Sequence, residues 1–584
     1  MKISRSILLS LTLAAGFALT GCGRQDKDTP LAFVPADTPY VFANIKPLPD
    51  AVSRAWFDRL EPLNAALGES VAALRAELAS HPDAAAEKLL AMMTLAEGRL
   101  SIEGMENMGI HRDALAAFYG VNLLPVLRIE LADPDAFRAF IADLDKQRGS
   151  PLPVAEIDGH PYWRVELQAG MPALVVAILD KHLVATLDAG AKGPPLAEQF
   201  GLRRPAHSLL ASGELTQLNR DYGFGPHGTF LFDNKRLAGA LVAGEGRDAG
   251  LASLLAARGK TLSPACRREL AGMADAVPRV VGGYDKLEAN AMTMTSVVEL
   301  RPDLLQGLLP IPAPVPGLGG AGDGKGMDFG FGAKLDKLAE FLQARATAIN
   351  ATPYQCEWFA ALNTGSGAFA QQIAGLYMAA GWFSGARVAL TDLKWTGDKP
   401  TAIEATLVIA SPNPAGLIGM AQGFVPQLAT LNLSPTAEAQ PIDLGPLAGG
   451  ILSANSRSAF IAVREGGIGI AIGANARQSV VEQLTAKASA PPPLLHIGYD
   501  GAIYSLLMGK LDEMTRSMSA MARAAEAAAH PGRAPGPDVD AAMAPLRAAV
   551  NHLSAGIDRV SVNAVVTERG LEVRQQMTVK LGRG

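Results

Sequence analysis

The 584-residue sequence contains only three cysteines, and charged residues make up 19% of it, less than the roughly one quarter that soluble domains usually carry. Three cysteines are too few for a small disulfide-held scaffold or a cysteine-rich zinc site. There is no basic excess either, because 52 Lys and Arg stand against 57 Asp and Glu, a net charge of −5. Since nucleic-acid binding relies on positive surface, this composition argues against a nucleic-acid partner.

Motifs that carry chemistry are also missing. The nine histidines are scattered, with no H-E-x-x-H or H-x-H pattern, so no metal site is predicted. Residues 319–325 have the spacing of a phosphate-binding loop, but Gly326 stands where Ser or Thr would ligate magnesium. We therefore expect no cofactor and no catalytic residue within a local motif. An active site assembled in space from distant residues stays open.

No apolar run is long enough to cross a membrane. The longest candidate, Ile373 to Ala386, is interrupted by glycines and Ser384 and falls short of about 18 apolar residues. Near its end, Tyr377 and Trp382 belong to an apolar group that also includes Leu376 and Phe383. This group predicts either a membrane-proximal or partner patch, or burial beneath the following strand, and burial is the simpler interpretation.

The N-terminus has the features of an export signal. Lys2 and Arg5 precede a short apolar segment that ends in Leu19-Thr20-Gly21-Cys22. These four residues resemble the lipobox of bacterial lipoproteins. The resemblance implies that residues 1–21 are a removed signal peptide and that the Cys22 thiol carries the lipid. Gly23 in the second mature position resembles the class directed to the outer membrane, facing the periplasm.

The body of the chain shows an internal repeat. A strand-like apolar segment followed by a helical stretch recurs four times, at residues 40–46, 228–235, 327–334 and 494–500. Between these copies, Asp133-Pro134 and Asn413-Pro414 each predict the N-cap of a helix after a strand. The predicted organisation is a tether at 22–30, a first half at 31–308, a Pro/Gly linker at 309–326 and a second half at 327–584.

The frequent hairpin signals favour an α+β fold. We expect a duplicated two-half body of antiparallel sheets with helices packed on one face, together with alanine-rich helical additions. Cys266 and Cys356 are separated by 90 residues, and the oxidising periplasm favours a disulfide between them. Two unpaired buried thiols are the alternative.

One helix carries a stripe of methionines that spans residues 507–521. Met514, Met518 and Met521 recur there at helical spacing together with Leu507 and Leu511. Methionine makes an adaptable surface, so the three methionines are a possible binding face. A stripe that faces the core is the simpler interpretation.

Pro35-Ala36-Asp37-Thr38 precedes the first predicted strand. It resembles the opening of uncharacterised bacterial envelope proteins that share a P-A-D-T start. That resemblance implies extracytoplasmic proteins with repeated αβ modules and no assigned activity. From the residues alone, Asp37 is expected to form a turn rather than to act in catalysis.

Together these features predict a membrane-anchored lipoprotein that acts as a non-enzymatic binding or adaptor module in the cell envelope. Its partners would be the membrane, through the N-terminal lipid, and an envelope protein or an apolar ligand. The alternatives are a hydrolase of envelope polymers and a purely structural surface lipoprotein.

Overall fold

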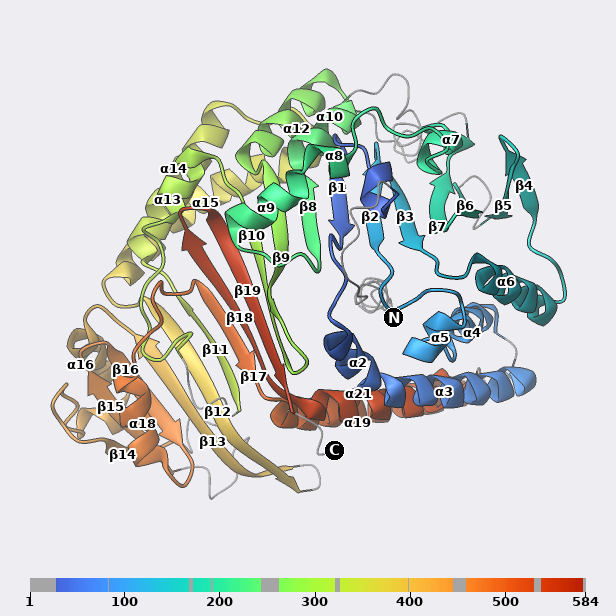
Figure 1. Cartoon of the computed structure of the whole chain (residues 1–584). Coiled ribbons are helices and arrows are strands. Elements are labelled where there is room, and N and C mark those ends of the chain that lie inside the picture. Colours follow the sequence, from blue (N-terminus) through green and yellow to red (C-terminus); the bar gives the residue numbers. More distant parts are fainter. Residues whose placement is uncertain are drawn as a thin grey trace. The chain divides into compact units, whose positions relative to one another are not determined.

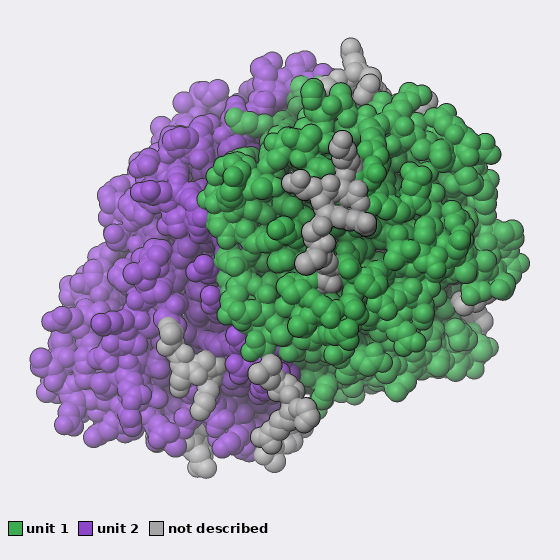
Figure 2. Space-filling model, in the orientation of Figure 1, with its two compact units in different colours: residues 1–262, 279–294, 507–554 green, residues 263–278, 295–506, 555–584 purple. Residues whose placement is uncertain are grey.

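The computed structural model describes residues 28–81, 83–166, 172–190, 193–242, 262–320, 326–396, 399–444, 458–529 and 537–580 (Figure 1). The predicted signal peptide and Cys22 lie outside the described residues. The fold is α+β, as expected, with antiparallel strands and many helices. The chain divides into two compact units, coloured separately in Figure 2. Unit 1 contains residues 1–262, 279–294 and 507–554, and unit 2 contains residues 263–278, 295–506 and 555–584.

The described residues of unit 1 form nine strands in the order β9-β8-β1-β2-β3-β7-β6-β5-β4, and all neighbours are antiparallel. The strands are β1 (Tyr40–Ala43), β2 (Ala116–Val121), β3 (Leu124–Glu130), β4 (Val154–Ile157), β5 (His160–Val165), β6 (Ala173–Leu179), β7 (His182–Asp188), β8 (Thr229–Asp233) and β9 (Arg279–Leu287). Strand β10 (Ala291–Val298) pairs with β9, and its residues are divided between the two units.

Unit 2, over the residues that the structure describes, also forms nine strands, in the order β19-β18-β17-β11-β12-β13-β16-β15-β14, again with antiparallel neighbours. The strands are β11 (Met327–Gly332), β12 (Gly385–Thr396), β13 (Lys399–Ala410), β14 (Gln440–Asp443), β15 (Ser458–Arg464), β16 (Gly467–Ile472), β17 (Leu495–Tyr499), β18 (Ile557–Thr567) and β19 (Gly570–Val579).

The two units share one connectivity. In each, the first strand pairs with the second strand along the chain on one side and with a late strand on the other, as β1 does with β2 and β8, and β11 with β12 and β17. After the third strand, the Asp133 and Asn413 side chains accept hydrogen bonds from the first turns of α6 (Pro134–Arg148) and α16 (Pro414–Phe424), which confirms both predicted N-caps. The shared order is consistent with duplication, which stays a prediction.

The helices of unit 1 contribute to two hydrophobic cores. They are η1 (Pro30–Phe33), α2 (Asp50–Asp58), α3 (Glu61–Ser80), α4 (Ala84–Ala96), α5 (Ile102–Glu106), α6, α7 (Leu196–Gln199), α8 (Leu209–Ser212), α9 (Glu214–Tyr222), α10 (Asn234–Val242), α20 (Val539–Ala542), α21 (Ala544–Gly556) and most of α19 (Gly501–Ala529). Phe137 on α6 packs with Phe57 on α2, while Val71 and Leu74 on α3 pack with Ala542 on α20.

The helices of unit 2 are α12 (Pro264–Ala276), α13 (Pro302–Leu308), α14 (Leu335–Ala351), η3 (Glu357–Phe359), α15 (Ala360–Ala380), α16, α17 (Pro426–Ala429) and α18 (Ala476–Thr485). Two of them, α16 and α18, cover opposite faces at one end of the sheet. Ile418 of α16 packs with Ile461 of β15, whereas Val480 of α18 packs with the neighbouring Ala462. Since adjacent strand residues point to opposite faces, α16 and α18 lie on opposite sides of β15 and β16, which refines the expected one-faced packing.

Two segments of unit 2 are fixed to its body. A disulfide joins Cys266, in the first turn of α12, to Cys356 before η3, with Cα atoms 4.5 Å apart, which confirms the predicted bond. Val315 and Leu318, from the predicted linker 309–326, are buried in a core with Val480. This part of the segment therefore packs as part of unit 2. Among the described helices, none is both long enough and apolar enough to cross a membrane.

Candidate functional site: an apolar sheet face

One face of the unit 2 sheet is apolar over five neighbouring strands. Because side chains alternate between faces along a strand, the cross-strand register identifies the residues that share a face. Phe329 on β11 pairs with Val388 on β12 and with Ile497 on β17. We call the surface that contains these three residues the apolar sheet face. Its members are Met327, Phe329, Phe331, Ala386, Val388, Leu390, Ala405, Leu407, Ile409, Leu495, Ile497, Tyr499, Val560, Val562 and Ala564.

The centre of the apolar sheet face is open. Phe329 and Val388, directly opposite each other, are each 46% exposed, and Phe331 is exposed as well. The ring of Phe331 lies 5.8 Å from that of Phe383, which follows α15. An exposed group of large apolar side chains on one sheet indicates a binding surface more often than isolated exposed residues do.

The opposite face of the same strands is polar and buried. Arg387 donates two hydrogen bonds to Asp328, from Nε to Oδ1 at 2.9 Å and from Nη2 to Oδ2 at 3.0 Å. His496 Nε2 lies 3.5 Å from Asp328 Oδ2, and its Nδ1 lies 2.7 Å from Asn563 Oδ1. Gln483 of α18 accepts a further hydrogen bond from Arg387. We call these five residues the buried polar cluster.

The buried polar cluster is electrostatically compensated. Burial alone would raise the pKa of Asp328, but the hydrogen bonds and charges of His496 and Arg387 outweigh it, so the pKa lies below its usual value. Gly317, from the segment predicted as a linker, lies directly against the cluster. Its φ is +70°, and a Cβ atom at this position would lie 2.1 Å from Arg387 Nη1. Since its charged groups are partnered and shielded from solvent, the cluster is better suited to hold the strands together than to act on a substrate.

Unit 1 presents a related face built from aromatic rings. Tyr40 on β1 lies 5.9 Å from Phe118 on β2 and 6.1 Å from Phe232 on β8, measured between ring centroids. The next pair along, Phe42 and Phe230, is stacked at 6.2 Å. Phe232 is the most exposed ring of this group. The aromatic positions match those of Phe329 and its neighbours in the shared connectivity.

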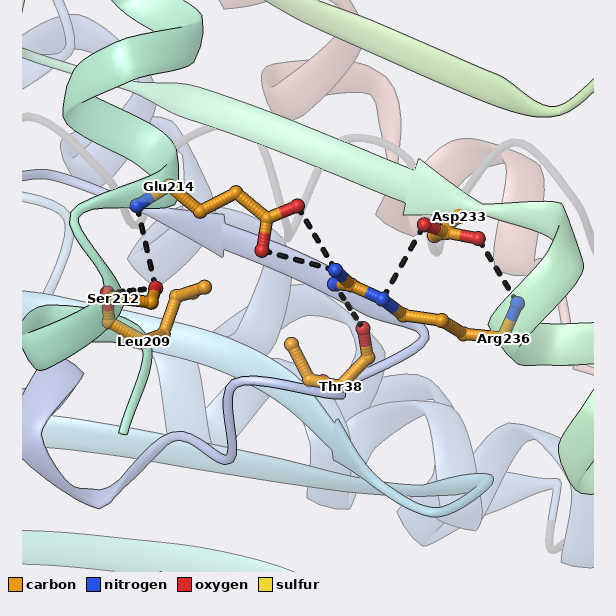
Figure 3. A network of polar contacts seen from close by, with 6 residues as sticks. All are labelled: Thr38, Leu209, Ser212, Glu214, Asp233 and Arg236. Atoms are coloured by element: carbon orange, nitrogen blue, oxygen red, sulfur yellow. Dashed lines mark hydrogen bonds and ion pairs between the residues drawn. The ribbon is translucent and has the colours of Figure 1, made fainter. Parts of the chain in front are cut away.

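The P-A-D-T residues have structural contacts. Thr38 is buried, and its hydroxyl donates to the Gly120 carbonyl at 2.7 Å and accepts from the Gly120 amide at 3.2 Å. Figure 3 shows the Thr38 carbonyl accepting from Arg236, which also contacts Glu214 at 3.0 and 3.1 Å and Asp233 at 3.3 Å. Asp37 is exposed, beside a turn closed by the Thr38 amide and the Pro35 carbonyl. The motif therefore fixes the start of β1.

A cavity of unit 1, about 1380 Å³, has charged groups of both signs on its wall, including Lys46, Glu130 and Asp113, and is also lined by His111. His111 Nδ1 lies beside the Asp113 carboxylate, and its Nε2 lies 3.7 Å from Glu106 Oε1. Within the described ranges, no group of three His, Cys, Asp or Glu side chains is placed to hold a metal ion.

The structure places the predicted site residues as follows. Cys22 lies outside the described residues, and Cys266 and Cys356 are bonded to each other. Met514, Met518 and Met521 are exposed, at 56%, 63% and 69%, so the core-facing interpretation of this stripe is wrong. The sequence predicted strands β11 and β17 of the apolar sheet face but not the face itself. The signal that could have found the face is the alternation of apolar residues with Asp328, Arg387 and His496 along three strands.

Comparison with protein-family models and with curated proteins finds no match. Among solved structures, one described as "Structure of crystal form I of TP0453" aligns with 11% sequence identity over 47% of this chain and 79% of that chain. The TM-score of that alignment is 0.21. A similarity at this level supports no conclusion about fold or function.

Proposed function

We propose that this chain is a lipid-anchored, non-enzymatic binding module of the bacterial cell envelope. It holds an apolar molecule with hydrocarbon chains against the apolar sheet face of unit 2. The observation that carries the proposal is the distribution of polarity across this sheet. The buried face contains Asp328, Arg387 and His496, whereas the face with open positions contains only apolar and aromatic side chains.

The backbone of this region favours a hydrocarbon over a peptide strand. Strands β11, β12, β13 and β17 are each paired on both sides, so none offers a free edge to which an extended peptide could add. Apart from the rim residue Tyr499, no side chain on the face donates or accepts a hydrogen bond. A ligand recognised there must be held by burial of apolar surface, and acyl chains have that chemistry.

The size of the effect follows from the open side chains. Full burial of a Val or Phe side chain is worth about 1.5–3 kcal/mol. Phe329 and Val388 are 46% exposed, so covering the remainder contributes about 0.7–1.4 kcal/mol each. Half-buried neighbours such as Ile497 add smaller amounts. Such contributions support reversible binding rather than a permanent complex.

The test is titration of the purified chain with a fluorescent polyene fatty acid, together with mass spectrometry of lipids that co-purify with it. Val388→Asp places a carboxylate at an open position, where it stays hydrated in the free protein but must be desolvated under a hydrocarbon chain. We expect it to weaken binding of the probe at least tenfold.

The matched control is Val154→Asp in unit 1, because Val154 is 64% exposed and lies outside the apolar sheet face. Thermal unfolding of both variants checks that they fold. Absence of probe binding by the parent chain, or equal weakening by the two variants, would refute the proposal.

A further inference from the structure

We propose that a second surface of unit 2 inserts into the boundary between headgroups and hydrocarbon on one side of a lipid bilayer. The surface consists of Tyr377, Met378, Trp382, Met420 and Phe424, and we call it the charge-free patch. This membrane contact is separate from the proposed function, which concerns the ligand that the apolar sheet face binds.

The sequence around the patch is depleted of charge. Residues 358–386 and 405–437 contain no Asp, Glu, Lys or Arg, although such residues make up 19% of the chain. The first run includes all of α15 and the second all of α16 and α17. Helices α15 and α16 are exposed over much of their length, so the absence of charge is not the result of burial in a core.

The side chains of the patch lie at the end of α15, just after it, and along the second half of α16. Phe424, in the last turn of α16, is 83% exposed, and Met420 lies one turn before it on the same face. Met378, in the last turn of α15, is 72% exposed, and Trp382 follows four residues later. Large apolar side chains at these exposures are unfavourable in water unless something covers them.

Trp382 connects the end of α15 to the start of α16, and Met420 and Phe424 follow Gly416 at intervals of four residues along α16. A Cβ atom added at Gly416, in the first turn of α16, would lie 2.8 Å from Cζ3 of Trp382. The indole therefore lies directly against α16, and the absent side chain of Gly416 makes room for it. The next residue, Phe383, contacts Phe331 of the apolar sheet face. The patch is thus continuous with the surface proposed to hold the ligand.

The chemistry of the patch fits a bilayer better than a protein partner. Protein interfaces surround their apolar centre with a polar rim. In the hydrocarbon boundary of a membrane, charged groups are costly, while Trp and Tyr are favoured because one end of each is apolar and the other can hydrogen-bond. Tyr377 has this arrangement, since its hydroxyl lies 3.2 Å from Gln343 Oε1 while its ring is exposed. Because no described helix can span a membrane, the contact is interfacial.

The experiment measures flotation of the chain from Gly23 onward with phosphatidylcholine vesicles. This chain retains every described residue and lacks Cys22, so a thiol-linked lipid cannot hold it to the vesicle. We expect the parent chain to float, and the double variant Met378→Asp with Phe424→Asp to bind at least tenfold more weakly. Val154→Asp serves as the matched control, because it adds a carboxylate at a similarly exposed apolar position and should bind like the parent.

Two further readouts separate insertion from charge attraction and from misfolding. Brominated lipid should quench part of the tryptophan fluorescence, and Trp382→Phe, which is conservative for packing, should remove that part. Raising the salt concentration from about 0.1 M to about 1 M shortens the Debye length from roughly 10 Å to 3 Å and should leave binding unchanged.

Failure of the parent to float, equal loss in the Val154→Asp control, or binding that requires anionic lipid would each overturn the proposal. So would self-association that the double variant abolishes, because the patch would then bind a second copy of the chain. Titration of the double variant with the fatty-acid probe distinguishes the two proposals. Retained probe binding with lost flotation means that the patch acts on the membrane and the sheet face acts on the ligand.

Discussion

Replacing Asp328 alone should destabilise unit 2 far more than replacing Asp328 and Arg387 together. The pair is buried, and its two hydrogen bonds link β11 to β12. The corresponding positions of unit 1, found from the matching registers of Phe42 with Phe118 and Phe329 with Val388, are occupied by apolar residues. The connectivity therefore does not require an ion pair at this place.

The magnitude follows from the loss of one partner inside a low-dielectric environment. Asp328→Leu leaves the Arg387 guanidinium buried without its carboxylate, which costs about 3–5 kcal/mol, and Arg387→Met leaves the carboxylate in the same situation. Replacing both removes the buried charges, and the remaining cost is about 1–3 kcal/mol, because His496 and Gln483 each lose a partner. The expected coupling energy is thus at least about 3 kcal/mol.

The assay is urea unfolding of the parent, both single variants and the double variant, analysed as a double-mutant cycle. Lys337 and Glu340 on α14 provide the control, since they form an exposed ion pair at 2.9 Å in the same unit and should couple by less than about 1 kcal/mol. Additive effects at Asp328 and Arg387 would refute the reasoning, because they would mean that neither charge depends on the other.

Three further results are expected. Replacing Cys266 and Cys356 by serine opens a loop spanning 90 residues and should destabilise unit 2 by about 4–5 kcal/mol, seen as a lower midpoint of thermal unfolding. Burial lowers the pKa of His182 to about 3 from an ordinary value of 6.5, so the unfolded chain binds a proton in this interval while the folded chain does not. Stability in urea should therefore fall from pH 6.5 towards pH 3 by up to about 1.4 kcal/mol per pH unit, and His182→Gln should remove that slope. Thr38→Val should cost about 1–3 kcal/mol in the same assay, because it leaves the buried amide of Gly120 without its side-chain acceptor.

Local signals in the sequence were sufficient for much of the fold. The four repeated apolar segments form β1, β8, β11 and β17, and the helix starts after Asp133 and Asn413 depend only on capping chemistry near the cap itself. The Cys266–Cys356 bond followed from the count of cysteines and the expected oxidising compartment. Each of these inferences needs only nearby residues or composition.

The candidate site depends on contacts between distant residues. The alternation on β11 identifies two faces of the strand but not which face is buried. Burial of the polar face depends on distant residues: His496 lies 168 positions after Asp328, and Gln483 belongs to α18. Polar residues are normally assigned to the solvent side, which here leads to the wrong face. For the same reason the Pro/Gly composition of residues 309–326 predicted a linker, although Val315 and Leu318 fill the core beneath α18.

The route of the chain between the two units determines when either unit can finish folding. Asp538 donates its amide hydrogen to Glu77, 461 residues earlier, and Ala542 packs against the core of α3. In unit 2, β17 pairs on its outer side with β18, which comes from residues 557–567 near the C-terminus. A chain that emerges with its N-terminus first therefore cannot complete the core around α3, or the pairing of β17 with β18, until almost all of it is available. Contacts between residues so far apart in the sequence form slowly, because a long loop must be closed first. Truncation near the C-terminus should therefore disrupt both units at once.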